Sequence, residues 1–279
     1  MESSNEQVAG AEAAKDFSGN YIDNFQGEKK EGLYSGKYLT WEKKENAFIF
    51  HGQYVSLEIK IISDDIIKFR HAIDGYFEDD FSYAIDPDIK YTNVDCKFEE
   101  SQHGFVLKTA ILKVHIDKED LSTKITDMEG VVVFQDEKGF HWEEHKHHGG
   151  SIKICTKTLQ KGEKFYGLGD KTGKLNLINT KRELWGTDCY GYGNDTDPVY
   201  KNIPFYMGQH SQIGYGVFMD NTFRSFFDFG KERNTVCSFW AQGGEMRYYF
   251  IMGPKLIDVA KKYTYLTGRP QLPPKWALG

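Results

Sequence analysis

The chain has 279 residues, of which 39% are hydrophobic, 27% charged and 15% aromatic. A chain of this length can bury roughly three quarters of its unfolded surface, so its size permits a substantial core. The formal net charge of −6 and the absence of a long basic run argue against nucleic acid or an anionic membrane as a partner. No window approaches the ~20 apolar residues that a membrane-spanning helix needs.

Residues 1–27 are polar and rich in small side chains, with no basic start and no apolar stretch. We expect a disordered tail here and not a signal peptide. We therefore expect a cytoplasmic protein, or a periplasmic one if a signal peptide has been removed.

Alternating apolar and polar residues fill most of positions 28–253, which predicts an all-β domain. In "YVSLEIKIIS" (54–63) the apolar side chains fall on one face, and "GFVLKTAILKVHID" (104–117) alternates in the same way. Such segments, separated by Asp, Gly and Asn clusters, are typical of an antiparallel β-sandwich. "VCSFWAQGGEMRYYFIMG" (236–253) predicts a hairpin around its two glycines.

One helix is expected near the end of the chain, over residues 254–268, because apolar residues recur there at helical spacing. Lys261 and Lys262 favour its C-terminal end, and Gly268 can close it in a left-handed conformation. Residues 269–279 predict a linker stiffened by a double proline, followed by "KWAL" as the beginning of a buried strand.

Three short motifs resemble cofactor-binding or metal-binding sequences only weakly, and we expect no cofactor and no metal ion. "YGLGDKTGKLNL" (166–177) lacks the spacing of a phosphate-binding loop and predicts a glycine-rich turn that lets the backbone approach a neighbour. "HWEEHKHHGG" (141–150) does not match the helical HExxH spacing, and its glycines indicate an exposed loop tip with surface histidines. "DTDP" (195–198) fails the calcium-loop pattern.

The four cysteines are expected to be free thiols. They lie far apart and form no CxxC pair, which argues against a disulfide scaffold or a zinc site. They are Cys96, Cys155, Cys189 and Cys237.

The stretch "ELWGTDCYGYGNDTDPVYKNIPFYMG" (183–208) places six aromatic residues among carboxylates, an amide and glycines. Aromatic rings stack on the C–H faces of sugars, and carboxylates accept hydrogen bonds from hydroxyl groups. The same composition suits a long loop whose aromatic residues only anchor it to the sandwich, and the residues alone leave both interpretations open. Hydrolysis by two of these aspartates would need separations that a sequence does not give.

Four segments, in order, resemble the N-terminal part of glycoside hydrolase family 31. They are "GEKFYGLGDKTGKLNL", "ELWGTDCYGYGNDTDPVYKNIPFYM", "YGVFMDNTFRSFFDFG" and "LTGRPQLPPKWALG". The resemblance is clear from Gly162 to Gly279 and weaker before it. It implies a galactose-mutarotase-like supersandwich that packs on a (β/α)8 catalytic barrel, of which residues 269–279 would be the connector and first strand.

The resemblance also implies a retaining α-glycosidase, with α-glucosidase activity expected, acting on α-linked oligosaccharides or glycosides. Its two catalytic aspartates would lie on the barrel, so we expect no catalytic residue in this chain and no hydrolysis by it alone. Asp188 in "WGTD" matches a family position on a loop that reaches the sugar pocket. Tyr192, Asn194 and Asp195 are expected to bind substrate as well. The sequence departs from the family at Gly186, where Asn is common.

Two other functions stay open. A stand-alone carbohydrate-binding module would use the same aromatic loop. A mutarotase-like epimerase would need a His general acid and a Glu general base, for which His210 and Glu245 are the available pair.

Overall fold

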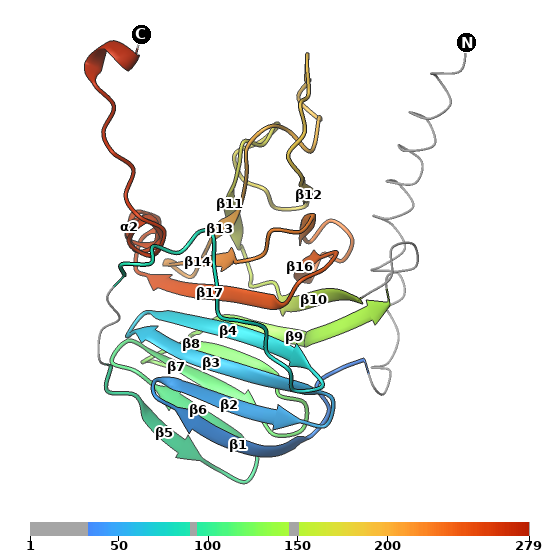
Figure 1. Cartoon of the computed structure of the whole chain (residues 1–279), viewed down its shortest axis with the longest axis vertical. Coiled ribbons are helices and arrows are strands. Elements are labelled where there is room, and N and C mark those ends of the chain that lie inside the picture. The colour runs from blue at the N-terminus through green and yellow to red at the C-terminus, as the bar shows by residue number, and fades with distance from the viewer. Residues whose placement is uncertain (1–32, 90–93, 145–150, 279) are drawn as a thin grey trace.

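The computed structural model describes residues 33–89, 94–144 and 151–278, so the predicted tail and His145, His147 and His148 lie outside the described residues. Two antiparallel sheets face each other and form a sandwich (Figure 1). The eight-stranded sheet runs in the order β1 (Tyr38–Lys44), β2 (Ala47–Gly52), β3 (Val55–Ser63), β4 (Ile66–Ile73), β17 (Met246–Gly253), β14 (Ile213–Met219), β13 (Asn202–His210), β11 (Lys164–Gly169). The nine-stranded sheet runs in the order β12 (Lys181–Leu184), β15 (Ser225–Phe229), β16 (Val236–Ala241), β10 (Ser151–Thr158), β9 (Val132–Glu144), β8 (Thr123–Asp127), β7 (Leu112–Asp117), β6 (Gly104–Lys108), β5 (Lys97–Glu100).

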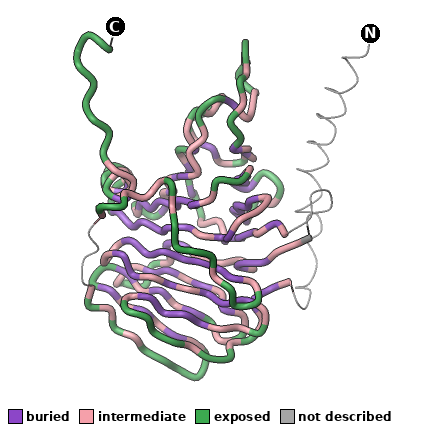
Figure 2. Tube along the Cα trace, viewed as in Figure 1, coloured by how far each residue is buried: buried purple, intermediate pink, exposed green. Residues whose placement is uncertain are grey.

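The core lies between the two sheets, as the alternating pattern predicts. On β3, Val55, Leu57 and Ile59 are fully buried and face the equally buried side chains of β6 and β7. Figure 2 shows the buried residues following the strands, while the upper projections are largely exposed. The predicted all-β antiparallel sandwich is therefore confirmed.

The helix α2 (Leu256–Leu266) packs on β13, β14 and β17, outside the sandwich core. Its own side chains Val259 and Leu266 are buried against these strands. The ring of Tyr263, also on α2, stacks on Phe205 with ring centroids 3.9 Å apart. Gly268 follows the helix with a φ of +83°, the left-handed conformation expected of it. The predicted helix and the residue that ends it are both confirmed.

Two local predictions are wrong. Residues 236–253 form no hairpin, because β16 pairs with β10 and β15 while β17 pairs with β4 and β14. The glycine turn passes the chain from one sheet to the other, and a turn signal does not specify the pairing partner. "KWAL" forms the exposed 3₁₀ helix η1 (Lys275–Leu278) instead of a strand, because a strand needs a neighbour for its hydrogen bonds and no described strand pairs with it.

The glycine-rich segment around β11 behaves as predicted. Gly167 and Gly169 have φ values of +120° and +81°, and a Cβ on either would meet the backbone oxygen of Phe205 or Lys201 within 2.7 Å. These glycines allow β11 to lie close against β13, and they bring the turn that follows β11 beneath the loop between β12 and β13.

Candidate functional site

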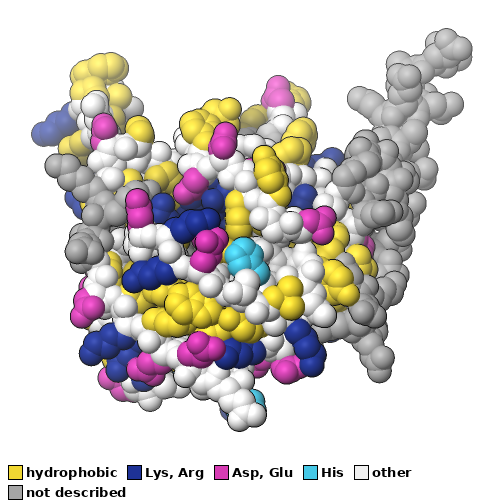
Figure 3. Space-filling model, turned by 60° about the horizontal axis from the view of Figure 1, so that its bottom comes forward, with side chains coloured by type: hydrophobic (Ala, Val, Ile, Leu, Met, Phe, Trp, Pro, Cys, Tyr) yellow, Lys and Arg dark blue, Asp and Glu magenta, His cyan; other side chains and the backbone are white. Residues whose placement is uncertain are grey.

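The loop between β12 and β13, residues 185–201, projects from the sandwich and is the candidate site (Figure 1). The space-filling view shows acidic and hydrophobic side chains together at the top of this projection (Figure 3). The four side chains predicted to bind substrate are all exposed on the loop. They are Asp188, Tyr192, Asn194 and Asp195.

Tyr200 brings two of these residues together, a role that was not predicted from the sequence. Its hydroxyl donates a hydrogen bond to the Cys189 carbonyl oxygen at 2.7 Å, and its ring centroid lies 6.1 Å from that of Tyr192. The pKa of Tyr200 is raised, first by local desolvation and then by the neighbouring Asp188 carboxylate. Asp188, Tyr192 and Tyr200 therefore form one exposed group of two aromatic rings and a carboxylate.

Asn194 and Asp195 occupy the two central positions of a separate turn. The backbone N–H of Thr196 donates to the Gly193 carbonyl at 3.4 Å, and the Gly193 N–H donates to Thr196 Oγ1 at 3.0 Å. This turn holds both side chains outward, as a polar edge next to the aromatic group.

Asp197, considered for calcium in "DTDP", is instead engaged with the protein. Its Oδ1 accepts a hydrogen bond from Lys171 Nζ at 3.0 Å, and its Oδ2 accepts one from the Glu183 N–H at 2.6 Å. Among the described residues no group of three or more His, Cys, Asp or Glu could hold a metal ion. His141, expected at the surface, is buried in β9 beside the Tyr34 ring, because β9 lies between β10 and β8 in the interior of the nine-stranded sheet.

The foot of the loop is fixed by charge and by stacking. The Arg224 guanidinium pairs with Glu183 and lies 5.8 Å from the centre of the half-exposed Trp185 ring. Burial raises the pKa of Glu183, while the paired Arg224 opposes that shift. Trp185 is thereby held at the rim of a hollow of about 450 Å³. Tyr83, Phe223 and Tyr263 line this hollow as well.

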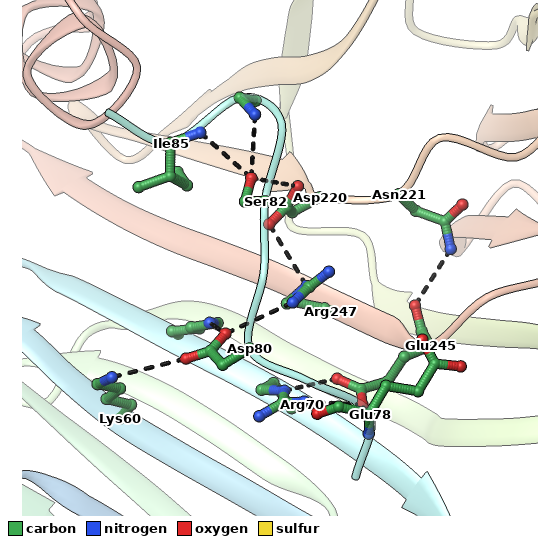
Figure 4. Close-up of polar contacts among 12 residues, drawn as sticks. Lys60, Arg70, Glu78, Asp80, Ser82, Ile85, Asp220, Asn221, Glu245 and Arg247 are labelled. Atoms are coloured by element: carbon green, nitrogen blue, oxygen red, sulfur yellow. Dashed lines mark hydrogen bonds and ion pairs between the residues drawn. The ribbon is translucent and has the colours of Figure 1, made fainter. Parts of the chain in front are cut away.

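The pair considered for epimerase chemistry is not assembled. His210 is buried, with Nε2 hydrogen-bonded to the Val133 carbonyl at 3.0 Å. Glu245 instead accepts two hydrogen bonds from Arg70, at 2.6 and 2.9 Å, and one from the Glu78 N–H at 3.0 Å (Figure 4). Since its carboxylate is occupied by these donors, Glu245 is not placed to act as a general base.

All four cysteines are free, as expected, and burial raises the pKa of Cys155 and Cys237. No helix among the described residues has both the length and the apolar character to cross a membrane.

Comparisons with known proteins agree with the fold. Residues 56–228 match the family described as glycosyl hydrolase 31 N-terminal galactose mutarotase-like domain. Alpha-glucosidase 2 of Bacillus thermoamyloliquefaciens is 33% identical over 88% of this chain and 30% of its own length. Alpha-xylosidase XylQ of Lactiplantibacillus pentosus is 32% identical over 69% of this chain and 25% of its own length.

A solved structure gives the same result. The GH31 dextranase of Flavobacterium johnsoniae, complexed with isomaltotriose, superposes with a TM-score of 0.79 and 33% identity, covering 88% of this chain and 30% of that one. The chain thus spans less than a third of the length of these relatives. With its fold, its loop and these matches, the chain belongs to the family of glycosyl hydrolase 31 N-terminal galactose mutarotase-like domains.

Proposed function

We propose that this domain serves a retaining α-glycosidase, in which the loop of residues 185–201 forms one wall of the sugar pocket against a catalytic (β/α)8 barrel. The observation that carries the proposal is the exposed group of Asp188, Tyr192 and Tyr200 on a projecting loop whose foot is fixed. The rings would cover the apolar face of a sugar, and the Asp188 carboxylate would accept hydrogen bonds from its hydroxyl groups.

The expected substrates are α-linked oligosaccharides of glucose. Two of the relatives above are an α-glucosidase and a dextranase complexed with isomaltotriose, each 33% identical to this chain. A retaining mechanism needs two carboxyl groups about 5–5.5 Å apart, one acting as nucleophile and one as acid and base. The family resemblance assigns both to the barrel, so we expect the 279-residue chain to release no glucose from an aryl α-glucoside.

The hollow at the foot of the loop supports packing on that second domain. Tyr83, Trp185 and Phe223 are at least half exposed around it. Exposed aromatic clusters of this kind are typical of surfaces that another protein unit covers. In this proposal the domain contributes a contact surface at the hollow and a substrate contact at the loop.

The test uses the full-length protein with Asp188→Ala, assayed on maltose and isomaltose. We expect kcat/KM to fall tenfold or more, because a hydrogen bond to a charged acceptor contributes about 1.5–3 kcal/mol. Glu99→Ala is the matched control, since Glu99 is an exposed carboxylate on β5, at the edge of the nine-stranded sheet opposite β12. Equal kcat/KM values for the two variants would show that Asp188 and its loop do not form part of the sugar pocket.

A further inference from the structure

Lys171 lies in the turn after β11, directly beneath the loop, and its side chain is only 3% exposed. Its Nζ donates three hydrogen bonds, to the Glu183 carbonyl at 2.6 Å, to Asp197 Oδ1 at 3.0 Å and to Asn202 Oδ1 at 3.0 Å. An ammonium group has three protons, so every donor of Lys171 is used.

Two of the three acceptors, Glu183 and Asn202, flank the loop, and Asp197 lies near its end. Asp197 and Asn202 also make further hydrogen bonds that tie the two ends of the loop together. Asp197 also accepts the Glu183 N–H at 2.6 Å. Asn202 donates from Nδ2 to the carbonyl oxygens of Trp185, at 3.0 Å, and Val199, at 2.9 Å. One buried cation thus joins the segment that enters the loop to the segment that leaves it, and we call this arrangement the neck.

Residues at the tip of the loop, above the neck, are hydrogen-bonded to one another. The bonds from Tyr200 to Cys189 and from Gly193 to Thr196 link tip residues to one another. Besides the bonds of the neck, Thr172 Oγ1 donates to the Thr196 carbonyl at 2.8 Å and the Asp170 N–H donates to the Lys201 carbonyl at 2.8 Å, and both link the loop to the segment after β11. The direction in which the tip points therefore depends on the neck.

Electrostatics make the cation difficult to replace. Burial lowers the pKa of Lys171, and the Asp197 carboxylate opposes that shift by favouring the charged form. A neutral side chain would leave Asp197, a carboxylate only 14% exposed, without its cation, which is costly. A planar guanidinium does not direct three protons along the diverging directions of the three acceptors.

We propose that Lys171 is a positioning residue that sets the pose of Asp188 and Tyr192 through the neck. The kinetic consequence rests on the proposed function of the loop, whereas the mechanical consequence does not. Each consequence has its own experiment.

The mechanical test measures hydrogen–deuterium exchange in the 279-residue chain. In Lys171→Met we expect the hydrogen-bonded amides in and beside the loop to exchange at least tenfold faster, with β14 and β17 unchanged. These are the amides of Asp170, Glu183, Gly193 and Thr196. Lys174→Met is the control, because Lys174 is an exposed lysine three positions further along. Unchanged exchange in the loop overturns the proposal, as does faster exchange throughout a chain that is still folded.

A second variant guards against misfolding. Lys171→Met combined with Asp197→Asn removes both charges and leaves an amide oxygen to accept the Glu183 N–H. It should fold and should still show the faster loop exchange. Lys171→Arg should fail to restore slow exchange, and full restoration by arginine would contradict the three-acceptor argument.

The kinetic test uses the full-length protein, normalised to the folded fraction. We expect Lys171→Met to lower kcat/KM about tenfold, and Asp188→Ala added to it to lower kcat/KM little further, because the carboxylate is already misplaced. A role in stability alone would leave kcat/KM per folded molecule unchanged. If Asp188→Ala has no effect while Lys171→Met still frees the loop, the proposed function fails and the positioning role stands. If Asp188→Ala lowers kcat/KM and Lys171→Met does not, the positioning role fails.

Discussion

Lys157 Nζ lies 2.6 Å from Asp136 Oδ1 between the two sheets, and the two side chains are only 3% and 6% exposed. The ammonium also donates to the Tyr248 hydroxyl at 3.0 Å and sits 4.4 Å from the centre of the Phe134 ring. Burial alone would lower the pKa of Lys157, but the Asp136 carboxylate reverses this and raises it. An ion pair thus connects β9 and β10 to β17 through the core.

Lys157→Met should lower the free energy of unfolding by about 3–5 kcal/mol, because it leaves Asp136 buried without its cation. Urea denaturation measures the loss. Adding Asp136→Asn should recover part of it, since the amide oxygen can still accept the Thr123 N–H and hydroxyl that Asp136 now accepts. A single variant as stable as the parent would show that the pair contributes little.

Asp228 predicts a pH dependence of stability. It is 1% exposed at the end of β15, and burial raises its pKa to about 6 although the N–H groups of Gly230 and Lys231 donate to Oδ1. The folded state therefore binds the proton more tightly than the unfolded chain does. This contribution to stability is present at pH 4, falls as the pH rises to about 6, and is constant above that value.

The measurement is urea denaturation of the parent and Asp228→Asn at pH 4 and pH 7. Asparagine can still accept the two N–H bonds but does not titrate. The stability difference between parent and variant should change by about 2 kcal/mol between the two pH values, in favour of the variant at pH 7. Parallel profiles would mean that Asp228 does not titrate in this range.

Asp80 holds residues 74–89 across the outer face of the eight-stranded sheet (Figure 4). Its carboxylate pairs with Lys60 on β3, Lys68 on β4 and Arg247 on β17. Burial opposes the charged form, but the Lys68 hydrogen bond prevails and lowers the pKa of Asp80 to about 2. Its contribution is therefore complete above the unfolded value of 3.8 and is lost as the pH falls through 2.

Pepsin cleavage within residues 74–89 tests this, with pepsin activity at each pH normalised on a peptide substrate. Cleavage of the parent should accelerate as the pH falls from 4 to 2, whereas Asp80→Asn should be cleaved rapidly at both values. Asp74→Asn is the control, because Asp74 is exposed at the start of the same segment. Resistance of Asp80→Asn at pH 4 would show that other contacts hold the segment.

Much of the fold could be predicted from the sequence, because the alternation of apolar and polar residues in strands and the helical spacing of apolar residues both indicate which side chains are buried. Val55, Leu57 and Ile59 were assigned to one face by their period, and the structure buries all three. The pairing of β16 and β17 was not accessible, since β16 is buried along its whole length and its pattern does not specify a neighbour.

The candidate site divides in the same way. The loop was recognisable because its aromatic and acidic residues are contiguous, and the structure exposes all four residues predicted to bind substrate. Lys171 was not recognisable, because it lies 26 positions from Asp197 and 31 from Asn202, and only the fold brings them together. Whether Asp188 contacts substrate remains a prediction.

The close packing of α2 on β14 at Gly216 predicts the effect of adding a methyl group there. A Cβ at Gly216 would lie 2.6 Å from Val259 Cγ1 and 2.8 Å from the Phe205 ring, closer than side-chain atoms can approach. Gly216→Ala should therefore displace the helix and lower the free energy of unfolding by about 1–3 kcal/mol. Thermal and urea denaturation measure the change.

Two further variants separate overpacking from other effects of the substitution. Gly186→Ala is the control, because a Cβ there meets no atom within 4 Å, and it should change stability by less than about 0.5 kcal/mol. In a Val259→Ala background the cost of Gly216→Ala should be smaller, since the nearest clashing methyl group is gone. An equal cost in both backgrounds would assign the effect to β14 itself and not to its contact with the helix.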